Sequence, residues 1–230
     1  KNVLKEKLIS IHIQNPKVNY NNFDFIISPN HDQIFGKNVI NSIGALHKFT
    51  LSEINKSKSL FDVPKNKKIV TLILGGDSNH YNFNNEILNI FLDKVENLNK
   101  DKEQYYFLFI SSRRTSKNAI EIIKKRFEKN HFVWDKITEN PYLYSLKIAD
   151  YIIITSDSIS MISEASSTGK PLFVNHLPFK RKTERFEYFH KEFEQKGITK
   201  PFKDTLYSWS YKSLNESERI AGILNTKILK

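Results

Sequence analysis

The chain has 230 residues, 39% hydrophobic and 27% charged, a composition typical of a folded globular protein and not of a disordered one. It contains no cysteine, which excludes disulfide frameworks, thiolate zinc sites and cysteine nucleophiles. Its apolar runs are too short to span a bilayer. The formal net charge of +11 favours acidic partners: nucleotides, nucleic acid or anionic lipid surfaces. We therefore expect a cytoplasmic protein, with the periphery of an anionic membrane as a second location.

Three short strands are predicted at the start of the chain, at residues 8–14, 23–28 and 38–44. Each is rich in β-branched or aromatic residues and is bounded by Asn, Pro or Gly. Little helix separates them, so residues 1–62 are too few for an independent domain. Because the chain opens on Lys1 and not on methionine, we expect this N-terminal Rossmann-like domain to be incomplete.

Beyond a lysine-rich stretch at residues 60–68, strands and helices alternate. The runs IVTLILGG, YYFLFISS, HFVWD, YIIIT and PLFV read as strands of a parallel sheet. Helices are predicted between them, and the first has a predicted buried stripe of Ile87, Ile90, Phe91, Lys94 and Leu98. This alternation predicts a doubly wound nucleotide-binding domain at residues 63–212.

Two further helices are predicted near the end of the chain. The segment KTERFEYFHKEFEQKG ends on Gly197, a residue suited to a helix C-cap. The last helix occupies residues 213–230, and we expect it to pack back onto the N-terminal domain.

Ligands of doubly wound sheets bind outside the carboxyl ends of the strands, and two turns there carry candidate residues. In LILGGDSNHYNF, Gly75 and Gly76 would let backbone amides approach a ligand, with Ser78 beside them, although a tight turn alone would also need glycine. In FISSRRTSKN, Arg113 and Arg114 suit a diphosphate because guanidinium groups bind phosphate oxygens bidentately. Two solvated surface arginines are the alternative.

A third turn, TSDSISMISE, combines hydroxyl groups with one carboxylate. Ser156, Asp157 or Ser158 would cap the following helix, and Ser160 lies in its first turn. Glu164 follows one turn later, where a carboxylate can accept both hydroxyls of a ribose. A capped core helix with Glu164 facing solvent is the alternative. Together, the three turns predict a nucleoside-diphosphate site at one rim of the sheet.

The stretch IISPNHDQIFGKN places His31 beside Asp32 after a predicted strand. A histidine next to a carboxylate often acts as a general base, whereas a lone histidine in a loop more often has a structural role. The other histidines show no metal-ligand spacing, and no paired-aspartate metal motif is present. We therefore expect neither a metal nor a cofactor, apart from a donor substrate.

Several segments, in the order IQNPKV, FDFIISPNHD, GGDSNHYNF, SSRRT, NPYLYSLKIADYIIITSDSISMISEASSTGKP and LPFKRK, resemble the mitochondrial fission "elongated mitochondria" family. The resemblance implies a fold similar to GT-B glycosyltransferases, with two Rossmann-like domains and a nucleotide sugar in the C-terminal one. SISMISEASSTGKPLFV looks like the donor-binding signature of the lipid II-forming N-acetylglucosaminyltransferase, with Glu164 at its ribose-binding glutamate. Gly75 and Gly76 fall at that enzyme's glycine-rich loop, although GGDSNHYNF differs from its sequence.

These observations predict an α/β, GT-B-like protein that transfers a sugar from a nucleoside diphosphate to an unknown acceptor. The donor diphosphate would lie at Gly75–Gly76 and Arg113/Arg114, and His31 or Asp32 would deprotonate the acceptor without a metal. A non-catalytic GT-B-like scaffold that recruits division or membrane partners through a basic face is the alternative. A nucleic-acid binder is the least favoured hypothesis.

Overall fold

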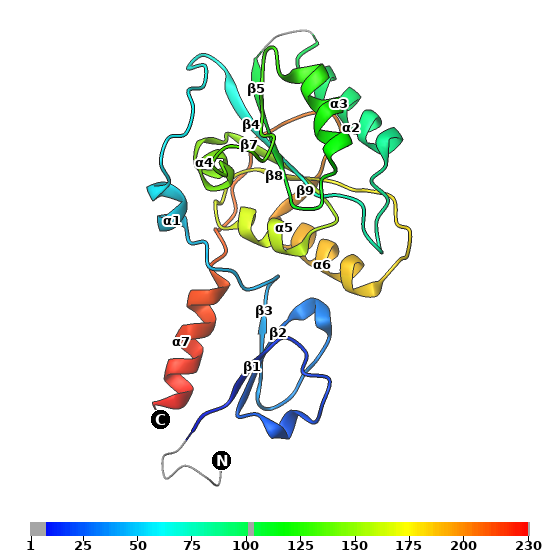
Figure 1. The fold of residues 1–230 in the computed structure, drawn as a ribbon. Helices are drawn as coiled ribbons and strands as arrows, with labels where there is room; N and C mark the ends of the chain where they lie inside the picture. Colours follow the sequence, from blue (N-terminus) through cyan, green and yellow to red (C-terminus); the bar gives the residue numbers. More distant parts are fainter. Residues whose placement is uncertain (1–7, 101–103, 230) are drawn as a thin grey trace.

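The protein forms two parallel β-sheets with helices packed on them (Figure 1). A computed structural model describes residues 8–100 and 104–229. The smaller sheet has the strand order β1-β2-β3, and the larger has the order β6-β5-β4-β7-β8-β9. All of these pairings are parallel. The larger sheet thus has the doubly wound strand order that binds dinucleotides in other proteins, which confirms the predicted α/β class.

The strands are short in the smaller sheet and longer at the centre of the larger one. They are β1 (Ile11–Ile13), β2 (Phe25–Pro29), β3 (Val39–Ser42), β4 (Lys68–Leu74), β5 (Tyr105–Ser111), β6 (Phe132–Val133), β7 (Tyr151–Thr155), β8 (Leu172–Asn175) and β9 (Thr199–Pro201). The helices are η1 (Tyr20–Asn22), η2 (Asn30–Asp32), α1 (Leu51–Lys56), α2 (Asn85–Asn97), α3 (Lys117–Phe127), α4 (Tyr142–Ile148), α5 (Ile159–Ser166), α6 (Glu184–Gln195) and α7 (Glu216–Ile228).

Helix α2 buries a face that only partly coincides with the predicted stripe. Its buried residues are Leu88, Phe91, Leu92 and Val95, which recur at helical spacing and contact the sheet. Ile90, which the predicted stripe included, is 49% exposed. Ile87 and Leu98 are partly buried and pack against the same core as Phe91, so the predicted stripe was right at these three apolar residues and wrong at Ile90, which lies on the solvent side of the helix.

Helix ends follow their predicted chemistry more closely. Ser158, one of the three predicted candidates, is the N-cap of α5, and Ser116 is the N-cap of α3. Each side chain accepts a hydrogen bond from a backbone N–H three residues later. Gly197 ends α6 with a left-handed φ of 68°, as expected of a C-cap glycine. Helix α1 was not predicted, although Thr50 and Glu53 form a complete capping box at its start.

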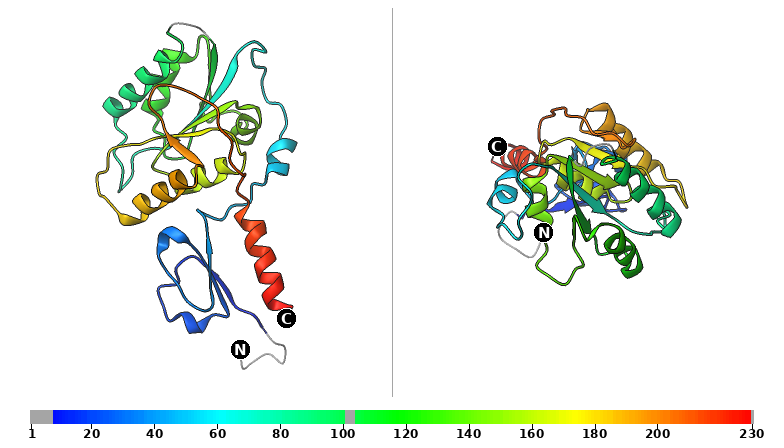
Figure 2. Two further views of the ribbon diagram at one scale, coloured as in Figure 1. Left: turned by 180° about the vertical axis from the view of Figure 1, so that it is seen from behind. Right: turned by 90° about the horizontal axis from the view of Figure 1, so that it is seen from above.

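The two sheets are covered to different extents (Figure 2). One face of the larger sheet packs on α2, α3 and the segment around Phe202, and the other packs on α4, α5 and α6. The smaller sheet packs on α7, where Ile27, Ile40 and Ile220 form a separate buried cluster. Among the described residues, no helix has the length and apolar character needed to cross a membrane.

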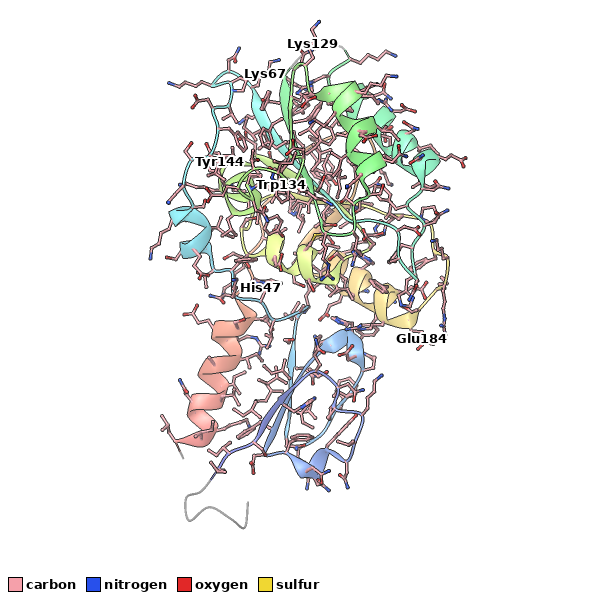
Figure 3. The ribbon with its side chains drawn as sticks, viewed as in Figure 1. His47, Lys67, Lys129, Trp134, Tyr144 and Glu184 are labelled. Carbon is pink, nitrogen blue, oxygen red and sulfur yellow. The ribbon has the colours of Figure 1, made fainter. Side chains whose placement is uncertain are left out.

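The chain crosses from the smaller to the larger sheet at Gly44, next to helix α5. Gly44 has φ +71°, and a Cβ there would lie 2.5 Å from Ser163 Oγ and 2.8 Å from Phe193 Cζ. The following Ala45 N–H donates to Ser163 Oγ (2.9 Å), and His47 Nε2 lies 3.1 Å from the Ser163 carbonyl oxygen. His47 marks this junction in Figure 3. Any other residue here would be strained by the positive φ and would have to displace the Ser163 or Phe193 side chain, so glycine allows the smaller sheet to lie close to α5.

Candidate functional site

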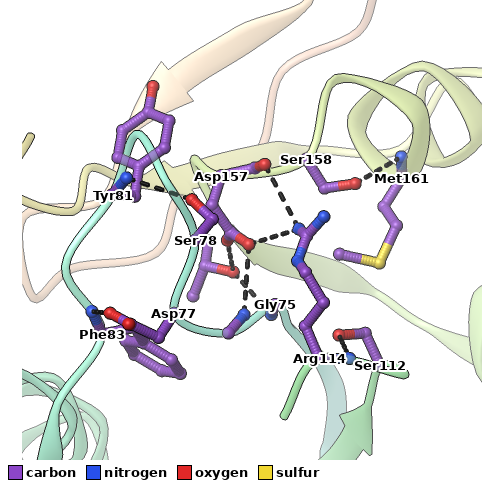
Figure 4. Close-up of polar contacts among 12 residues, drawn as sticks. Gly75, Asp77, Ser78, Tyr81, Phe83, Ser112, Arg114, Asp157, Ser158 and Met161 are labelled. Carbon is purple, nitrogen blue, oxygen red and sulfur yellow. Dashed lines mark hydrogen bonds and ion pairs between the residues drawn. The ribbon is translucent and has the colours of Figure 1, made fainter. Parts of the chain in front are cut away.

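A buried carboxylate, Asp157, fills the crevice at the switch point between β4 and β7 (Figure 4). Its Oδ2 accepts hydrogen bonds from the Gly76 N–H (3.1 Å) and from Arg114 Nη2 (2.5 Å). Its Oδ1 accepts from Thr155 Oγ1 (2.7 Å), which in turn accepts from the Gly75 N–H (2.8 Å). One carboxylate thus joins the turns after β4, β5 and β7, and Arg114 balances its charge.

The two glycines are required by this network and not by backbone conformation. A Cβ at Gly75 would lie 2.0 Å from Asp157 Oδ2, and one at Gly76 would lie 2.1 Å from the Arg114 carbonyl oxygen. The sequence prediction assigned their amides to a ligand, whereas in the structure both amides donate within the protein. Their role at this rim is close packing.

Two of the predicted serines also make contacts within the chain. Ser78 Oγ accepts from the Tyr81 N–H (3.0 Å) and closes the β4–α2 loop. Ser156 is fully buried, and its Oγ accepts from the Leu177 N–H (2.9 Å). Both hydroxyl oxygens therefore stabilise loops, and the ligand contact predicted for them stays a prediction.

A cavity of about 420 Å³ opens beside this network, between the ends of β5 and β6 and helix α5. We call it the rim cavity. The residues that matter for its chemistry are Phe49, Arg113, Trp134, Tyr142, Met161 and Glu164. A smaller recess, formed by Ser112, Arg113, Arg114, Ser158 and Met161, shares three of its lining residues and extends it towards the start of α5.

Glu164 lies at the wall of the rim cavity and is half-buried. The Tyr142 hydroxyl donates to its Oε2 at 2.8 Å, which fixes the carboxylate and leaves Oε1 for another donor. Burial raises the pKa of Glu164, and the hydrogen bond from Tyr142 opposes this shift. The alternative in which Glu164 faces solvent is not what the structure shows.

The adjacent arginines point to different partners. Arg114 is bound to Asp157, whereas Arg113 lines both the rim cavity and the recess. Arg113 is exposed and makes no ion pair with any of the residues that the structure describes. Ser158 lines the recess as the N-cap of α5, while Ser160 is exposed outside it. Arg113, Ser158 and Glu164 thus meet at one opening.

His31 and Asp32 lie at another cavity, of about 730 Å³, between η2 and α6. We call it the α6 cavity. The His31 side chain is 0% exposed, and burial lowers its pKa to about 4. Arg185 Nε lies 2.7 Å from Asp32 Oδ1. The structure does not bring these two candidate bases to the rim cavity.

Sequence reasoning missed the aromatic and basic residues on the β6–α4 side of the rim cavity. Trp134 follows β6, and Tyr142 begins α4. Lys136 donates to the Thr115 carbonyl oxygen (2.7 Å) from a backbone with φ 70°, and burial lowers its pKa. Trp134 lies near the end of the predicted strand HFVWD and Tyr142 follows that strand, so their position at the carboxyl edge was a usable signal. The left-handed backbone at Lys136 had no such signal in the sequence.

Comparison with known proteins adds a family and a fold. The chain is 30% identical to "Uncharacterized protein RP120" of Rickettsia prowazekii over 95% of this chain and 73% of that protein. It is 25% identical to "Mitochondrial fission protein ELM1" of Arabidopsis thaliana over 94% of this chain and 57% of that one. Among solved structures it resembles S. aureus MnaA, in a co-structure with UDP, at a TM-score of 0.50 and 13% identity, covering 90% of this chain and 60% of that one.

The structural likeness shows the fold alone, and it confirms the predicted GT-B-like arrangement. The chain spans less than two thirds of the plant relative and of MnaA. The family sequence model described as "Mitochondrial fission ELM1" matches residues 1–228. This protein therefore belongs to the mitochondrial fission ELM1 family.

Proposed function

We propose that this protein binds a nucleoside diphosphate sugar at the rim cavity and transfers the sugar to an acceptor hydroxyl. The observation that carries the proposal is Glu164, a half-buried carboxylate that Tyr142 holds at 2.8 Å next to the cationic Arg113. Such a carboxylate can accept hydrogen bonds from both hydroxyls of a ribose. The fold shared with MnaA, which was solved with UDP, supports a nucleotide as the ligand.

The rest of the opening suits the other parts of such a ligand. Phe49, Trp134 and Tyr142 line the cavity and provide flat apolar surface for a base. Arg113 and the N-terminus of α5, capped by Ser158, would bind the diphosphate, because a guanidinium and a helix N-terminus both attract anions. Arg114 is left to neutralise Asp157, so the buried carboxylate does not repel the phosphates.

In the transfer step, the acceptor oxygen attacks the anomeric carbon of the sugar. The bond between that carbon and the diphosphate oxygen breaks, and its electron pair leaves with the nucleoside diphosphate. The acceptor proton passes to a base, for which His31 and Asp32 are the candidates. Because both lie at the α6 cavity, the step requires η2 to shift relative to the rim cavity.

The proposal is tested by calorimetric titration with UDP, CDP, GDP and ADP. We expect one nucleotide to bind, and Glu164→Ala to weaken binding roughly 10–100-fold, since hydrogen bonds to a charged group contribute about 1.5–3 kcal/mol. Glu121→Ala is the matched control, because Glu121 is exposed on α3. If no nucleotide binds, or if both variants bind equally, the rim cavity is not a nucleotide site.

A nucleotide-binding scaffold without transfer is a second candidate. It is favoured by the state of the two candidate bases, since His31 is buried and Asp32 is paired with Arg185. A scaffold of this kind would recruit division or membrane partners. Incubation with the nucleotide sugar that binds best separates the two candidates. Slow release of nucleoside diphosphate, detected by phosphorus NMR, supports transfer or hydrolysis, whereas binding without release supports the scaffold.

A further inference from the structure

The α6 cavity contains a histidine whose ring nitrogens have no hydrogen-bond partner. His31 is 2% exposed, and neither Nδ1 nor Nε2 is hydrogen-bonded. Its ring packs edge-on against Phe189, with the ring centroids 5.5 Å apart. Buried polar groups are nearly always hydrogen-bonded. Two buried, unbonded ring nitrogens beside a cavity of about 730 Å³ are a reason to look for a polar ligand there.

The backbone around this cavity is unusual. Gln14, Lys17 and Gln33 have φ values of 80°, 54° and 52°, in the left-handed region that non-glycine residues seldom adopt. All three line the α6 cavity. In the described parts of the chain, only two other non-glycine residues share this conformation. Such positions cluster at sites where the backbone is shaped for a ligand.

The cavity is lined by two lysines that are available to an anion. Lys17 approaches from the β1–η1 loop, and Lys191 from α6. Within the described residues, neither of them makes an ion pair. Of the carboxylates that line the cavity, Glu187 is paired with Lys182 (2.6 Å) and Asp32 with Arg185. Glu184, in the first turn of α6, also lines the cavity and is the one acidic residue there without such a pair in the described chain.

Arg185 and His31 compete for one oxygen atom. Arg185 Nε lies 2.7 Å from Asp32 Oδ1, and His31 Nε2 lies 3.9 Å from the same oxygen. The contact with Asp32 uses Nε, so the two Nη groups of Arg185 remain available. A guanidinium binds a phosphate through two parallel hydrogen bonds, which the single contact with Asp32 does not match.

We propose that the α6 cavity binds a phosphate-bearing ligand, and that its phosphate draws Arg185 away from Asp32. The inference rests on the proposed function for the role of this ligand, which is the sugar acceptor, and adds that the acceptor carries a phosphate group. Lys17 and Lys191 supply the remaining positive charge.

The exchange would prepare the base. Once Arg185 has moved, a small shift of the His31 ring would let Nε2–H donate to Asp32 Oδ1, now 3.9 Å away. The same shift would have to expose Nδ1, which is buried, before it could take the acceptor proton. Burial is the largest influence on the pKa of His31 and lowers it, Asp32 raises it and Arg185 lowers it, so moving Arg185 away would make the ring more basic. Acceptor binding and readiness for proton transfer are then linked through a single arginine.

The test follows the ring signals of His31 by nitrogen–proton NMR in the full chain. Glucose 1-phosphate is the soluble probe, and vesicles containing phosphatidylglycerol are the lipid-phosphate probe. We expect one of them to shift the His31 signals saturably. Arg185→Gln should weaken that response at least tenfold, and Arg185→Lys should restore it only in part, because lysine lacks the bidentate fork.

Arg181→Gln is the matched control, since Arg181 is an exposed arginine outside the cavity. A response to glucose 1-phosphate alone assigns a soluble acceptor, and a response to vesicles alone assigns a lipid one. No response to either probe, or equal responses of the Arg185→Gln and Arg181→Gln variants, overturns the proposal. Glu164→Ala should leave the response unchanged, so loss of nucleotide binding and loss of phosphate binding are separate results.

Discussion

The two sheets of this protein differ in how they are stabilised. The larger sheet is covered on both faces, and its central strands are almost fully buried. The smaller sheet has three short strands and a buried cluster of three residues against α7, while Ile11 and Ile13 on β1 remain exposed. Burial of apolar area dominates folding free energy, so the larger sheet provides most of the stability. The smaller sheet depends on its contacts with α5, α6 and α7.

The largest expected effect comes from the core of the larger sheet. Phe173 is fully buried, and its ring centroid lies 4.9 Å from that of Trp209. We expect Phe173→Ala to lower the free energy of unfolding by about 3–5 kcal/mol, because it leaves a cavity. Phe35→Ala, at a phenylalanine that is 66% exposed in the smaller region, should cost less than about 0.5 kcal/mol. Urea unfolding followed by circular dichroism measures both, and equal losses would contradict the contrast between the sheets.

A smaller and more local effect is expected at α7. Ile220 is 2% exposed and packs against the smaller sheet, so Ile220→Ala should cost about 2–4 kcal/mol locally. Hydrogen exchange should become faster in β2 and β3 but stay slow in β4 and β7, because the two regions can open separately. Ile228→Ala, further along the same helix and partly exposed, serves as the control. Equal acceleration in β4 would show that the two sheets open as one unit.

The smallest effect concerns the junction between η2 and α6. Burial lowers the pKa of His31 to about 4, below its ordinary value of 6.5. As the pH falls, the unfolded chain therefore binds the proton first. The contribution of neutral His31 to the free energy of unfolding is complete above pH 6.5 and is lost as the pH falls towards 4. By pH 5 the loss is about 2 kcal/mol.

His190, on the side of α6 that faces the larger sheet, has a pKa that burial lowers to about 3, so it adds a similar loss. His31→Gln should remove only the His31 share of the pH dependence between pH 7 and pH 5. Urea unfolding at both pH values gives the difference. A slope identical to that of the unmodified protein would show that His31 is already solvated or paired.

Much of the fold could be predicted from the sequence because local chemistry agrees with the tertiary structure. Buried strands read as continuous apolar runs, and Ser158 and Gly197 mark helix ends that the structure confirms. Helix α1 and strand β9 were missed for a different reason: with six and three residues they are too short for a periodic pattern. Strand β9 also contains Pro201, which argues against a strand except at an edge.

The candidate site was less predictable, because its contacts join residues far apart in the chain. Nothing local indicates that Arg114 binds Asp157, 43 residues later, or that this pair explains Gly75 and Gly76. The sequence correctly placed Arg113, Ser158 and Glu164 at one edge, since parallel strands end together. It could not place His31 at a second cavity, because that depends on how one sheet sits on the other.

Gly44 limits which substitutions the protein can accept between its two sheets. A side chain at this position would contact Ser163 and Phe193 at less than van der Waals distance, so a substitution requires its neighbours to move. Gly44 itself lines neither cavity, so a mutation here would act through the packing between the two sheets. Position 44 therefore sets how closely the two sheets pack against each other. The effect of Gly44→Ala on activity would report how much relative movement of the two halves the protein needs.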